Sequence, residues 1–219
     1  MLFRKKKILV ACCSNRNPEW PTVLAIQDAM RHTAKAGHDL VFKPRVGESL
    51  ICRARQNDLV VLMQRSFDRI IWIDDDVVIP SNAITELLNA DKDIVAGVYR
   101  IKQDEPAAAV RLPPDGPEWN KVLYDGLLTK ALYVSTGCFM VKREVVQCMI
   151  EKFPGQKYYR NVSADEAWAL FQPYVYEKEY LSEDWAFCQR ALDAGLEVWV
   201  HGGVKCDHWG KRVFRFGEM

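Results

Sequence analysis

The sequence lacks any paired cysteine motif. It holds seven cysteines, an odd number, and no two of them form a Cys-x-x-Cys pair. This pattern argues against a disulfide framework and against a cysteine zinc site. Most of the thiols lie within apolar segments, so we expect them to be buried and reduced, as in a cytoplasmic protein. The cysteines are Cys12, Cys13, Cys52, Cys138, Cys148, Cys188 and Cys206.

The sequence also lacks a long apolar run. No stretch approaches the roughly 18 apolar residues that a membrane-spanning helix needs. The first segment, MLFRKKKILVACC, has a basic cluster before a short apolar run, but no small-residue cleavage site follows it, which argues against a signal peptide. We therefore expect no transmembrane segment, although basic residues 4–7 allow a peripheral contact with an acidic membrane surface.

The sequence also lacks an excess of charge of either sign. The chain has 30 Lys and Arg against 29 Asp and Glu, for a net charge of +1. A general nucleic-acid binder normally carries a marked basic excess, so this class of partner is not expected. The 219 residues are 49% hydrophobic, which is enough for one sizeable core, and they predict a single domain over 1–219.

Strand and helix signals alternate through residues 1–100. Apolar β-prone runs are separated by segments in which apolar residues recur at helical spacing. Strands spaced by helices predict a mostly parallel sheet with helices on both faces, a style typical of a nucleotide-binding half. The predicted strands cover residues 7–12, 39–44, 70–73 and 93–100, and the predicted helices cover residues 19–36, 47–66 and 82–90.

Residues 101–219 differ in character from residues 1–100. Short apolar segments predict antiparallel or edge strands, and a loop-like stretch rich in aromatic residues suits the lining of a ligand cleft. Ser182 is a good N-cap for a helix that Gly195 ends. The predicted strands cover 121–124, 131–137, 138–143 and 196–200, the short helix 143–152, and the loop 153–181.

Three consecutive aspartates end the predicted strand in RIIWIDDDVVIP. The carboxyl edge of a mostly parallel sheet is where α/β proteins bind ligands, and strand alternation predicts Asp74 and Asp76 on one side and Asp75 on the other. Mg²⁺ and Mn²⁺ often bind through one or two carboxylates plus substrate phosphates. The residues alone leave two interpretations open, a divalent-cation site and a solvated acidic turn before a helix.

Four segments resemble those of glycosyltransferases with the GT-A fold, and they come in that family's order. RIIWIDDDVVIP resembles the Asp-x-Asp metal and sugar-nucleotide motif, and STGCFMVKREVV resembles the segment beside the donor and acceptor sugars. YLSEDWAFCQRALDAGLEVWV is similar to the Glu-Asp helix, and CDHWGK to the metal-binding histidine segment. The chain looks closest to the family-2-like enzymes and to compact viral or phage-type members.

This resemblance implies both a fold and a reaction. The fold would be α/β of the GT-A type, a single Rossmann-like mixed sheet flanked by helices with a smaller antiparallel acceptor-side sheet. The reaction would be Mn²⁺- or Mg²⁺-dependent transfer of a sugar from a nucleotide-diphosphate sugar, a UDP-sugar, to a glycan or carbohydrate acceptor, with inversion.

Two other functions stay open, a nucleotidyltransferase that makes sugar nucleotides and a nucleotide-sugar binding module without turnover. The nucleotidyltransferase normally has a glycine-rich phosphate loop after its first strand, and ACCSNRNPEW has none. Only an activity assay distinguishes the binding module from an enzyme.

The resemblance also assigns roles to residues. It makes Asp76, Asp74 and His208 metal ligands, with Asp74 and Asp75 also contacting the nucleotide sugar. It makes Asp184 the general base, with Glu183 as the second candidate. Further nucleotide-sugar contacts are expected from Cys13, Ser14, Arg53, Asn57, Gly137 and Lys211.

Most of these residues have a purely structural alternative. Acids in the first turn of a helix stabilise its dipole without catalysis. Arg53 and Asn57 lie four positions apart and share one face of the predicted second helix, which is either the nucleotide pocket or an exposed surface. Gly137 fits a tight turn, and His208 and Lys211 fit a solvated tail.

Overall fold

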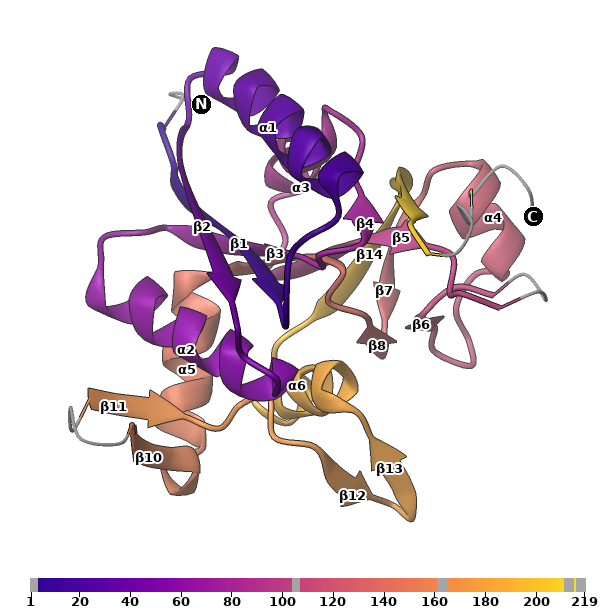
Figure 1. Cartoon of the computed structure of the whole chain (residues 1–219). Helices are drawn as coiled ribbons and strands as arrows, with labels where there is room; N and C mark the ends of the chain where they lie inside the picture. The colour runs from indigo at the N-terminus through magenta and orange to yellow at the C-terminus, as the bar shows by residue number, and fades with distance from the viewer. Residues whose placement is uncertain (1–3, 104–106, 161–164, 211–214, 216–219) are drawn as a thin grey trace.

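A computed structural model describes residues 4–103, 107–160, 165–210 and 215, and shows a central β-sheet flanked by helices (Figure 1). The strand order is β2-β1-β3-β9-β5-β14-β4, and β7 pairs with β14 outside this path. The strands are β1 (Lys7–Ser14), β2 (Asp39–Val46), β3 (Arg69–Ile73), β4 (Val77–Val78), β5 (Ile94–Tyr99), β7 (Leu128–Ala131), β9 (Cys138–Lys142) and β14 (Val198–His208).

The direction of the strands brings several carboxyl ends together. Strand β1 is parallel to β2 and β3, and β14 is parallel to β5. Strand β9 lies between β3 and β5 and is antiparallel to both, so β3 and β5 run in the same direction. The carboxyl ends of β1, β3, β5 and β14 therefore meet at one edge of the sheet, where α/β proteins bind ligands.

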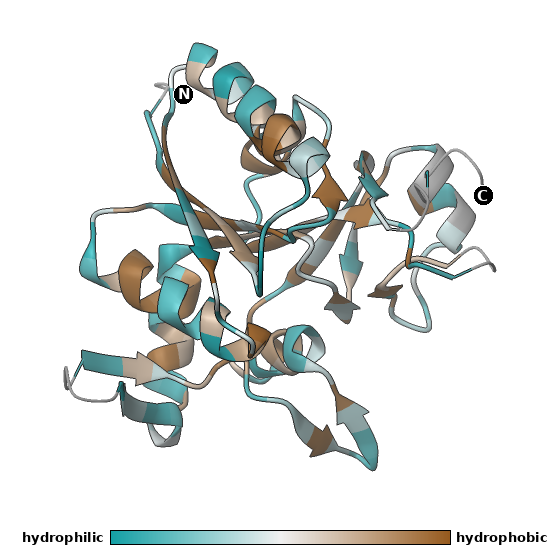
Figure 2. Ribbon diagram, viewed as in Figure 1, coloured by the Kyte–Doolittle hydropathy of each residue, from teal (hydrophilic) through white to brown (hydrophobic). Residues whose placement is uncertain are grey.

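Alternating apolar side chains give the sheet two buried faces. In β1, Ile8 and Val10 pack into one core, while Leu9 and Ala11 pack into the other. Helices α1 and α3 cover the first face, and α2, α5 and α6 cover the second (Figures 1 and 2). The helices are α1 (Trp20–Lys35), α2 (Ile51–Gln64), α3 (Ala83–Asn89), α4 (Trp119–Tyr124), α5 (Arg143–Lys152) and α6 (Glu183–Asp193).

The predicted α/β class, a mixed sheet flanked by helices with smaller antiparallel sheets, is confirmed. The predicted caps of α6 are confirmed as well, because Ser182 is its N-cap and Gly195 follows it with a φ of +78°. Among the helices of the described residues, none combines the length and apolar character needed to cross a membrane.

The prediction that residues 153–181 form a loop is wrong. They contain η1 (Pro154–Gln156) and two antiparallel pairs, β10 (Lys157–Arg160) with β11 (Asp165–Trp168) and β12 (Tyr174–Tyr176) with β13 (Glu179–Leu181). Between the pairs, Phe171 is fully buried and stacks on Phe187 with 4.4 Å between ring centroids. Strands this short carry too little alternation to be detected in a sequence.

The prediction of a strand at residues 121–124 is also wrong, because this segment forms most of α4. Val122 is fully buried in the core that α2, α5 and α6 cover. An apolar run of four residues fits a strand or one helical turn equally well, and periodicity does not separate them. A third small sheet pairs β6 (Val110–Arg111) with β8 (Tyr133–Val134).

Strand β14 is longer than the sequence predicted. The expected strand ended at Val200, but β14 continues to His208 after a register shift against β5 between Val200 and Lys205. Such an irregularity bends a strand and redirects the residues that follow it. Beyond the shift, β14 pairs with β5 again, and His208 lies opposite Val77 of β4. The extension brings the C-terminal histidine beside the three aspartates.

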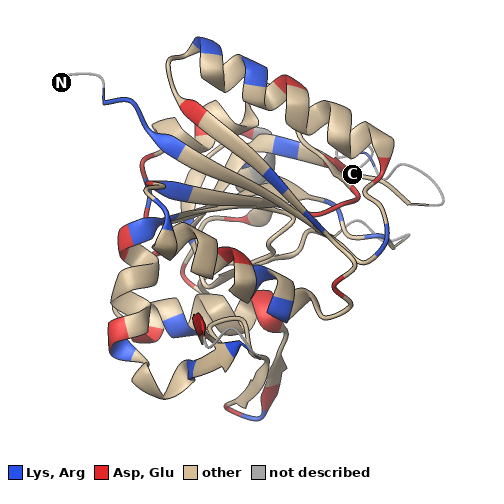
Figure 3. Cartoon of the chain, turned by 60° about the vertical axis from the view of Figure 1, so that its left-hand side comes forward, with Lys and Arg blue, Asp and Glu red and all other residues tan. Residues whose placement is uncertain are grey.

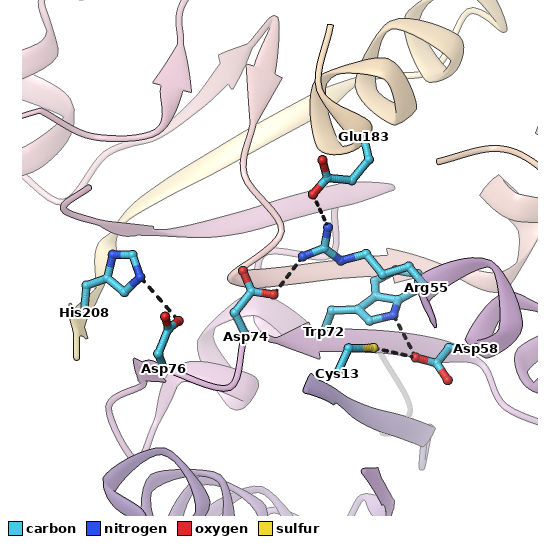
Figure 4. Close-up of polar contacts among 8 residues, drawn as sticks. All are labelled: Cys13, Arg55, Asp58, Trp72, Asp74, Asp76, Glu183 and His208. Carbon is cyan, nitrogen blue, oxygen red and sulfur yellow. Dashed lines mark hydrogen bonds and ion pairs between the residues drawn. The ribbon is translucent and has the colours of Figure 1, made fainter. Parts of the chain in front are cut away.

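Asp58 of α2 is a fully buried carboxylate that ties this helix to three strands. Its Oδ1 accepts hydrogen bonds from Nε and Nη2 of Arg45 at 3.1 and 2.7 Å. Its Oδ2 accepts from Trp72 Nε1 at 3.3 Å and from the Cys13 thiol at 3.2 Å (Figure 4). A buried carboxylate is tolerated only when it is paired in this way.

We expect Asp58→Ala to lower the free energy of unfolding by about 3–5 kcal/mol, because the change leaves the Arg45 charge and two buried donors without their acceptor. Urea unfolding measures the effect. The matched control is Asp28→Ala, which removes an exposed carboxylate paired with Arg31 at 3.2 Å and should leave the unfolding midpoint unchanged. A midpoint for Asp58→Ala equal to that of the control would contradict the prediction.

Candidate functional site

The candidate site lies at the sheet edge where β1, β3, β5 and β14 end. Ser14 is the last residue of β1, Asp74 directly follows β3, and His208 ends β14. Gly137 directly precedes β9, and its carbonyl accepts a hydrogen bond from the Asp74 backbone N–H at 3.2 Å. Residues from both predicted halves of the chain therefore meet at this edge.

Asp76 and His208 face each other at the site (Figure 4). His208 Nε2 lies 3.3 Å from Asp76 Oδ1, and His208 Nδ1 lies 2.9 Å from the carbonyl oxygen of Arg100. A carbonyl only accepts hydrogen bonds, so Nδ1 must carry the proton. His208 Nε2 then faces the Asp76 carboxylate, an arrangement that is favourable when a proton or a cation lies between the two atoms.

Lys102 also pairs with Asp76, through its ammonium group. Burial alone would raise the pKa of Asp76, but the contacts with His208 and Lys102 hold this pKa below its usual value. The backbone N–H of Trp209 donates to the Asp76 carbonyl at 2.7 Å and fixes the chain after β14 against the aspartate turn. Asp76 is thus an ionised carboxylate with two basic partners.

Asp74 takes part in a separate contact. Arg55 of α2 donates from Nη2 to Asp74 at 2.7 Å and from Nη1 to Glu183 at 2.8 Å (Figure 4). The Arg55 side chain is only 3% exposed. Burial opposes its charge, but Asp74, Glu183 and Asp184 outweigh burial and raise the pKa of Arg55. One buried guanidinium therefore joins the end of β3 to the start of α6.

Asp184 is the half-buried acid beside this bridge. Burial raises the pKa of Asp184, and the negative charge of Glu183 adds to the shift. The Ser182 hydroxyl and the Trp185 backbone N–H, the latter at 2.8 Å, both donate to Asp184 Oδ1 and work in the opposite direction. A carboxylate with a raised pKa and one oxygen unused by these bonds is suited to take up a proton.

Asp75 points into a different environment from its neighbours. Burial raises the pKa of Asp75, as do the negative charges of Asp76 and Asp74, whereas the nearby Ser14 hydroxyl lowers it. The Asp75 carbonyl accepts a hydrogen bond from the Glu19 backbone N–H at 2.8 Å. Asp75 therefore lies toward β1 and the start of α1, with the Ser14 hydroxyl near its carboxylate.

The Tyr99 ring packs against both Gly137 and His208. It meets the His208 ring edge to face, with 5.2 Å between centroids. A Cβ at Gly137 would lie 2.6 Å from two ring carbons of Tyr99, which is closer than atoms can approach. Gly137 is therefore required for packing against Tyr99, and burial raises the pKa of this tyrosine well above its usual value.

The remaining predicted residues lie away from Asp76. The Cys13 thiol donates to buried Asp58, so it faces the core. Arg53 is exposed and pairs with Glu48 at 2.7 Å, and Asn57 accepts from Arg160 at 3.0 Å. Arg53 and Asn57 each lie two positions from Arg55 along the chain, which places them on the opposite side of α2. Lys211 is outside the described residues.

Arg55 is the site residue that the sequence prediction missed. It shares a helical stripe with Asp58, Leu59 and Leu62, all of which are fully buried. A charged residue within such an apolar stripe needs a buried partner of opposite charge, and this signal was present in the sequence.

The predicted metal ligands are brought together only in part. Within the described residues, no group of three His, Cys, Asp or Glu side chains is arranged to hold a metal ion. Asp76 and His208 form a pair, while Arg55 holds the Asp74 carboxylate. A pair of this kind suits a cation whose other ligands come from water and phosphate.

No family model and no curated protein matches the sequence. Among solved structures, the chain is similar to A197 from STIV, with a TM-score of 0.56 and 16% identity over 94% of this chain and 86% of that chain. An identity this low shows a shared fold and says nothing about activity.

Two other solved structures are more distant. One is an inositol-1-phosphate CTP transferase from T. maritima, with a TM-score of 0.44 and 13% identity over 90% of this chain and 85% of that chain. The other is described as a glucose-1-phosphate thymidylyltransferase from Bacillus anthracis, with a TM-score of 0.37 and 11% identity over 68% and 75% of the two chains. Likenesses at these TM-scores carry no argument about function.

We expect Gly137→Ala to destabilise the protein by about 1–3 kcal/mol, because the added methyl group forces the Tyr99 ring out of its place. Thermal unfolding measures the loss. Gly155→Ala is the matched control, because a Cβ at Gly155 meets nothing within 4 Å and should leave the melting temperature near that of the parent. Equal melting temperatures for the two variants would show that the close packing of Tyr99 is not needed.

Proposed function

We propose that this chain is a metal-dependent glycosyltransferase that moves a sugar from a nucleotide-diphosphate sugar, a UDP-sugar, to a hydroxyl group of a glycan. The observation that carries the proposal is the pair of Asp76 and His208 at the carboxyl edge of the sheet, with His208 Nε2 facing the carboxylate at 3.3 Å and Nδ1 held by the Arg100 carbonyl. Residues 1–219 would act as one domain, with 1–100 holding the nucleotide and 101–219 the acceptor.

The residues present fit a divalent cation. A metal-binding histidine commonly donates its second ring N–H to a backbone carbonyl, as His208 does to Arg100. Asp76 and His208 would hold the ion, and the nitrogen ligand favours Mn²⁺ over Mg²⁺. When bound, the metal would stabilise negative charge on the departing diphosphate. Lys102, which pairs with Asp76, would lie beside the same phosphates.

Asp184 would act as the general base. In this step the acceptor oxygen forms a bond to the anomeric carbon, the bond from that carbon to the diphosphate oxygen breaks, and its electron pair leaves with the diphosphate. The hydroxyl proton passes to Asp184. Attack from the side opposite the leaving group inverts the anomeric carbon.

Arg55 separates the roles of the neighbouring acids. It pairs with Asp74 and with Glu183, so both carboxylates are held by a full positive charge. Burial raises the pKa of Asp184 in spite of the nearby Arg55 charge, which suits this carboxylate to accept a proton. Asp74, at the end of β3, would position the nucleotide through the backbone turn and its second oxygen.

A product assay separates this proposal from its alternatives. The chain is incubated with a panel of UDP-sugars and glycan acceptors, with and without Mn²⁺. Metal-dependent release of UDP together with a glycosylated acceptor supports the proposal. Formation of a sugar nucleotide and pyrophosphate from a nucleoside triphosphate and a sugar phosphate would identify a nucleotidyltransferase, and binding without any product would identify a binding module.

We expect Asp76→Ala to abolish the metal-dependent part of nucleotide binding, because His208 alone cannot hold the cation. A thermal-shift titration with UDP in the presence and absence of Mn²⁺ measures this. Asp93→Ala is the control, since Asp93 pairs with Lys142 at 3.1 Å next to the start of β5, at the opposite edge of the sheet. If Asp76→Ala kept the full Mn²⁺-dependent shift, the metal assignment would be abandoned.

We expect Asp184→Asn to retain UDP binding and to lower kcat by about 10²–10⁴-fold, the usual range for the loss of a general base. Asp193→Asn, which changes an acid at the other end of α6, should leave kcat unchanged. Near-parental kcat for Asp184→Asn, with a large loss for Glu183→Gln, would move the base to Glu183.

The pH profile gives an independent check. The base works only when it is ionised. Because the pKa of Asp184 is raised, the transfer rate should drop, as the pH is lowered, at a higher pH than it would with an ordinary aspartate. The loss follows protonation, and therefore the rate increases with pH through this pKa. An acid limb at the pH of an unperturbed aspartate would contradict the assignment.

A further inference from the structure

Two adjoining cavities lie between α2 and β10, on the side of α2 that bears Arg53. The first has a volume of about 370 Å³ and is lined by residues from the start of α2, by Gly155 and by Tyr158. The second has a volume of about 580 Å³ and is lined by Arg45, Asn57, Tyr159 and others. Arg53 and Tyr158 line both cavities, so the two form one continuous surface.

The first cavity contains a buried hydrogen-bond donor without a partner. Gln56 is 5% exposed, and its side-chain carbonyl accepts a hydrogen bond from the Tyr158 hydroxyl at 2.9 Å. The Gln56 Nε2 group has no hydrogen-bond partner. A buried amide group rarely stays unpaired, so this N–H group points to a ligand that supplies an acceptor.

The same cavity lies at the N-terminus of α2. This helix has 14 residues and no acidic residue in its first turn, but the Glu48 carboxylate before it accepts hydrogen bonds from the Leu50 backbone N–H at 3.1 Å and from Arg53. The partial positive charge of a helix start attracts an anion, and a ligand anion would take the place of Glu48 there. Arg53, one turn from the start, adds a full positive charge beside Gln56, and Lys157 lines the cavity from β10.

The second cavity combines basic and aromatic side chains. Arg45 and Arg160 line it together with Tyr159, whose side chain is 64% exposed. Glu48 forms a bidentate pair with Arg53, and Asp165 pairs with Arg160, so an anionic ligand would bind by exchange for these carboxylates. Exposed phenol rings offer flat surfaces on which sugar rings pack. Figure 3 shows Lys and Arg residues interspersed with acidic ones over α2 and its neighbours.

We propose that these two cavities form a binding site for an anionic glycan segment. A sugar carboxylate or phosphate ester binds at Gln56 Nε2, Arg53 and the start of α2, and the adjoining sugar packs on Tyr158 and Tyr159. The inference that this glycan segment belongs to the acceptor rests on the proposed glycosyl transfer, whereas the inference of a binding site does not. Because Arg53 and Asn57 face away from Arg55, this ligand is distinct from the nucleotide for which the sequence suggested these two residues.

The site is tested by NMR titration of the full-length ¹⁵N-labelled chain without metal or nucleotide. The probes are trigalacturonic acid, which carries carboxylates, and glucose 6-phosphate, with maltotriose and inorganic phosphate for comparison. We expect the two anionic sugars to shift the amide signals of residues 50–57 and 155–159 and to bind at least tenfold more tightly than maltotriose. The tighter of the two identifies the source of the anion.

Two variants and a control locate the binding. Arg53→Gln and Gln56→Leu should each weaken binding of the anionic sugars at least tenfold. Gln56→Leu removes the unpaired donor and also the acceptor of the Tyr158 hydroxyl, so its melting temperature is measured beside its affinity. If this variant fails to fold, Arg53→Gln decides. Arg31→Gln is the matched control, because Arg31 is an exposed arginine paired with Asp28 on α1, and it should bind as the parent does.

Three results would overturn the proposal. These are equal affinity for maltotriose and the anionic sugars, parental affinity in Arg53→Gln, and inorganic phosphate binding as tightly as glucose 6-phosphate, which would reveal a bare anion site. Asp76→Ala should bind trigalacturonic acid normally. If the chain binds this probe but shows no transfer, the proposed function is wrong and the glycan site stands. If the chain shows transfer but does not bind the probe, the glycan site is wrong and the proposed function stands.

Discussion

The site depends on the buried guanidinium of Arg55. It satisfies two carboxylates, Asp74 and Glu183, that lie 19 and 128 positions away in the sequence. Removing a charge from water is costly, and the cost is recovered only when partners of opposite charge are held in good geometry. The rest of the fold supplies that geometry, because α2 packs under β1 and α6 packs beside it. Arg55 thereby fixes the distance between the aspartate turn and the Glu-Asp helix.

The second constraint is an antiparallel strand, β9, inserted between the parallel strands β3 and β5. Strand β9 enters the sheet at the edge where β3 and β5 end, so Gly137 comes beside Asp74 and Tyr99. The register shift in β14 then carries His208 to the same edge. The position of β9 follows from its pairing with β3 and β5, whereas the register shift falls in the segment that contains Gly202 and Gly203.

Much of the fold was predictable from the sequence, because its main strands and helices have strong periodicity and well-placed caps, as Ser182 and Gly195 show for α6. The errors have common causes. The run at residues 121–124 was too short to separate helix from strand, and the pairs in 153–181 are stabilised by tertiary contacts of Phe171. A spacing of four predicts that Arg53 and Asn57 share a helix face, but the buried stripe that holds Arg55 and Leu59 marks the face that packs on the sheet. The roles of Asp76, Asp184 and His208 stay predictions.

Lys102 gives the aspartate turn an internal counter-ion. Its ammonium group pairs with Asp76, as the Arg55 guanidinium pairs with Asp74. Under the proposed function, a divalent ion would enter by exchange for this ammonium group rather than by filling an empty position. The net affinity of the metal would be the difference between the contact of Asp76 with the metal and its contact with Lys102. Metal binding would become favourable when a diphosphate arrives and pairs with the displaced Lys102 ammonium group. Donor and metal would then be loaded as a unit.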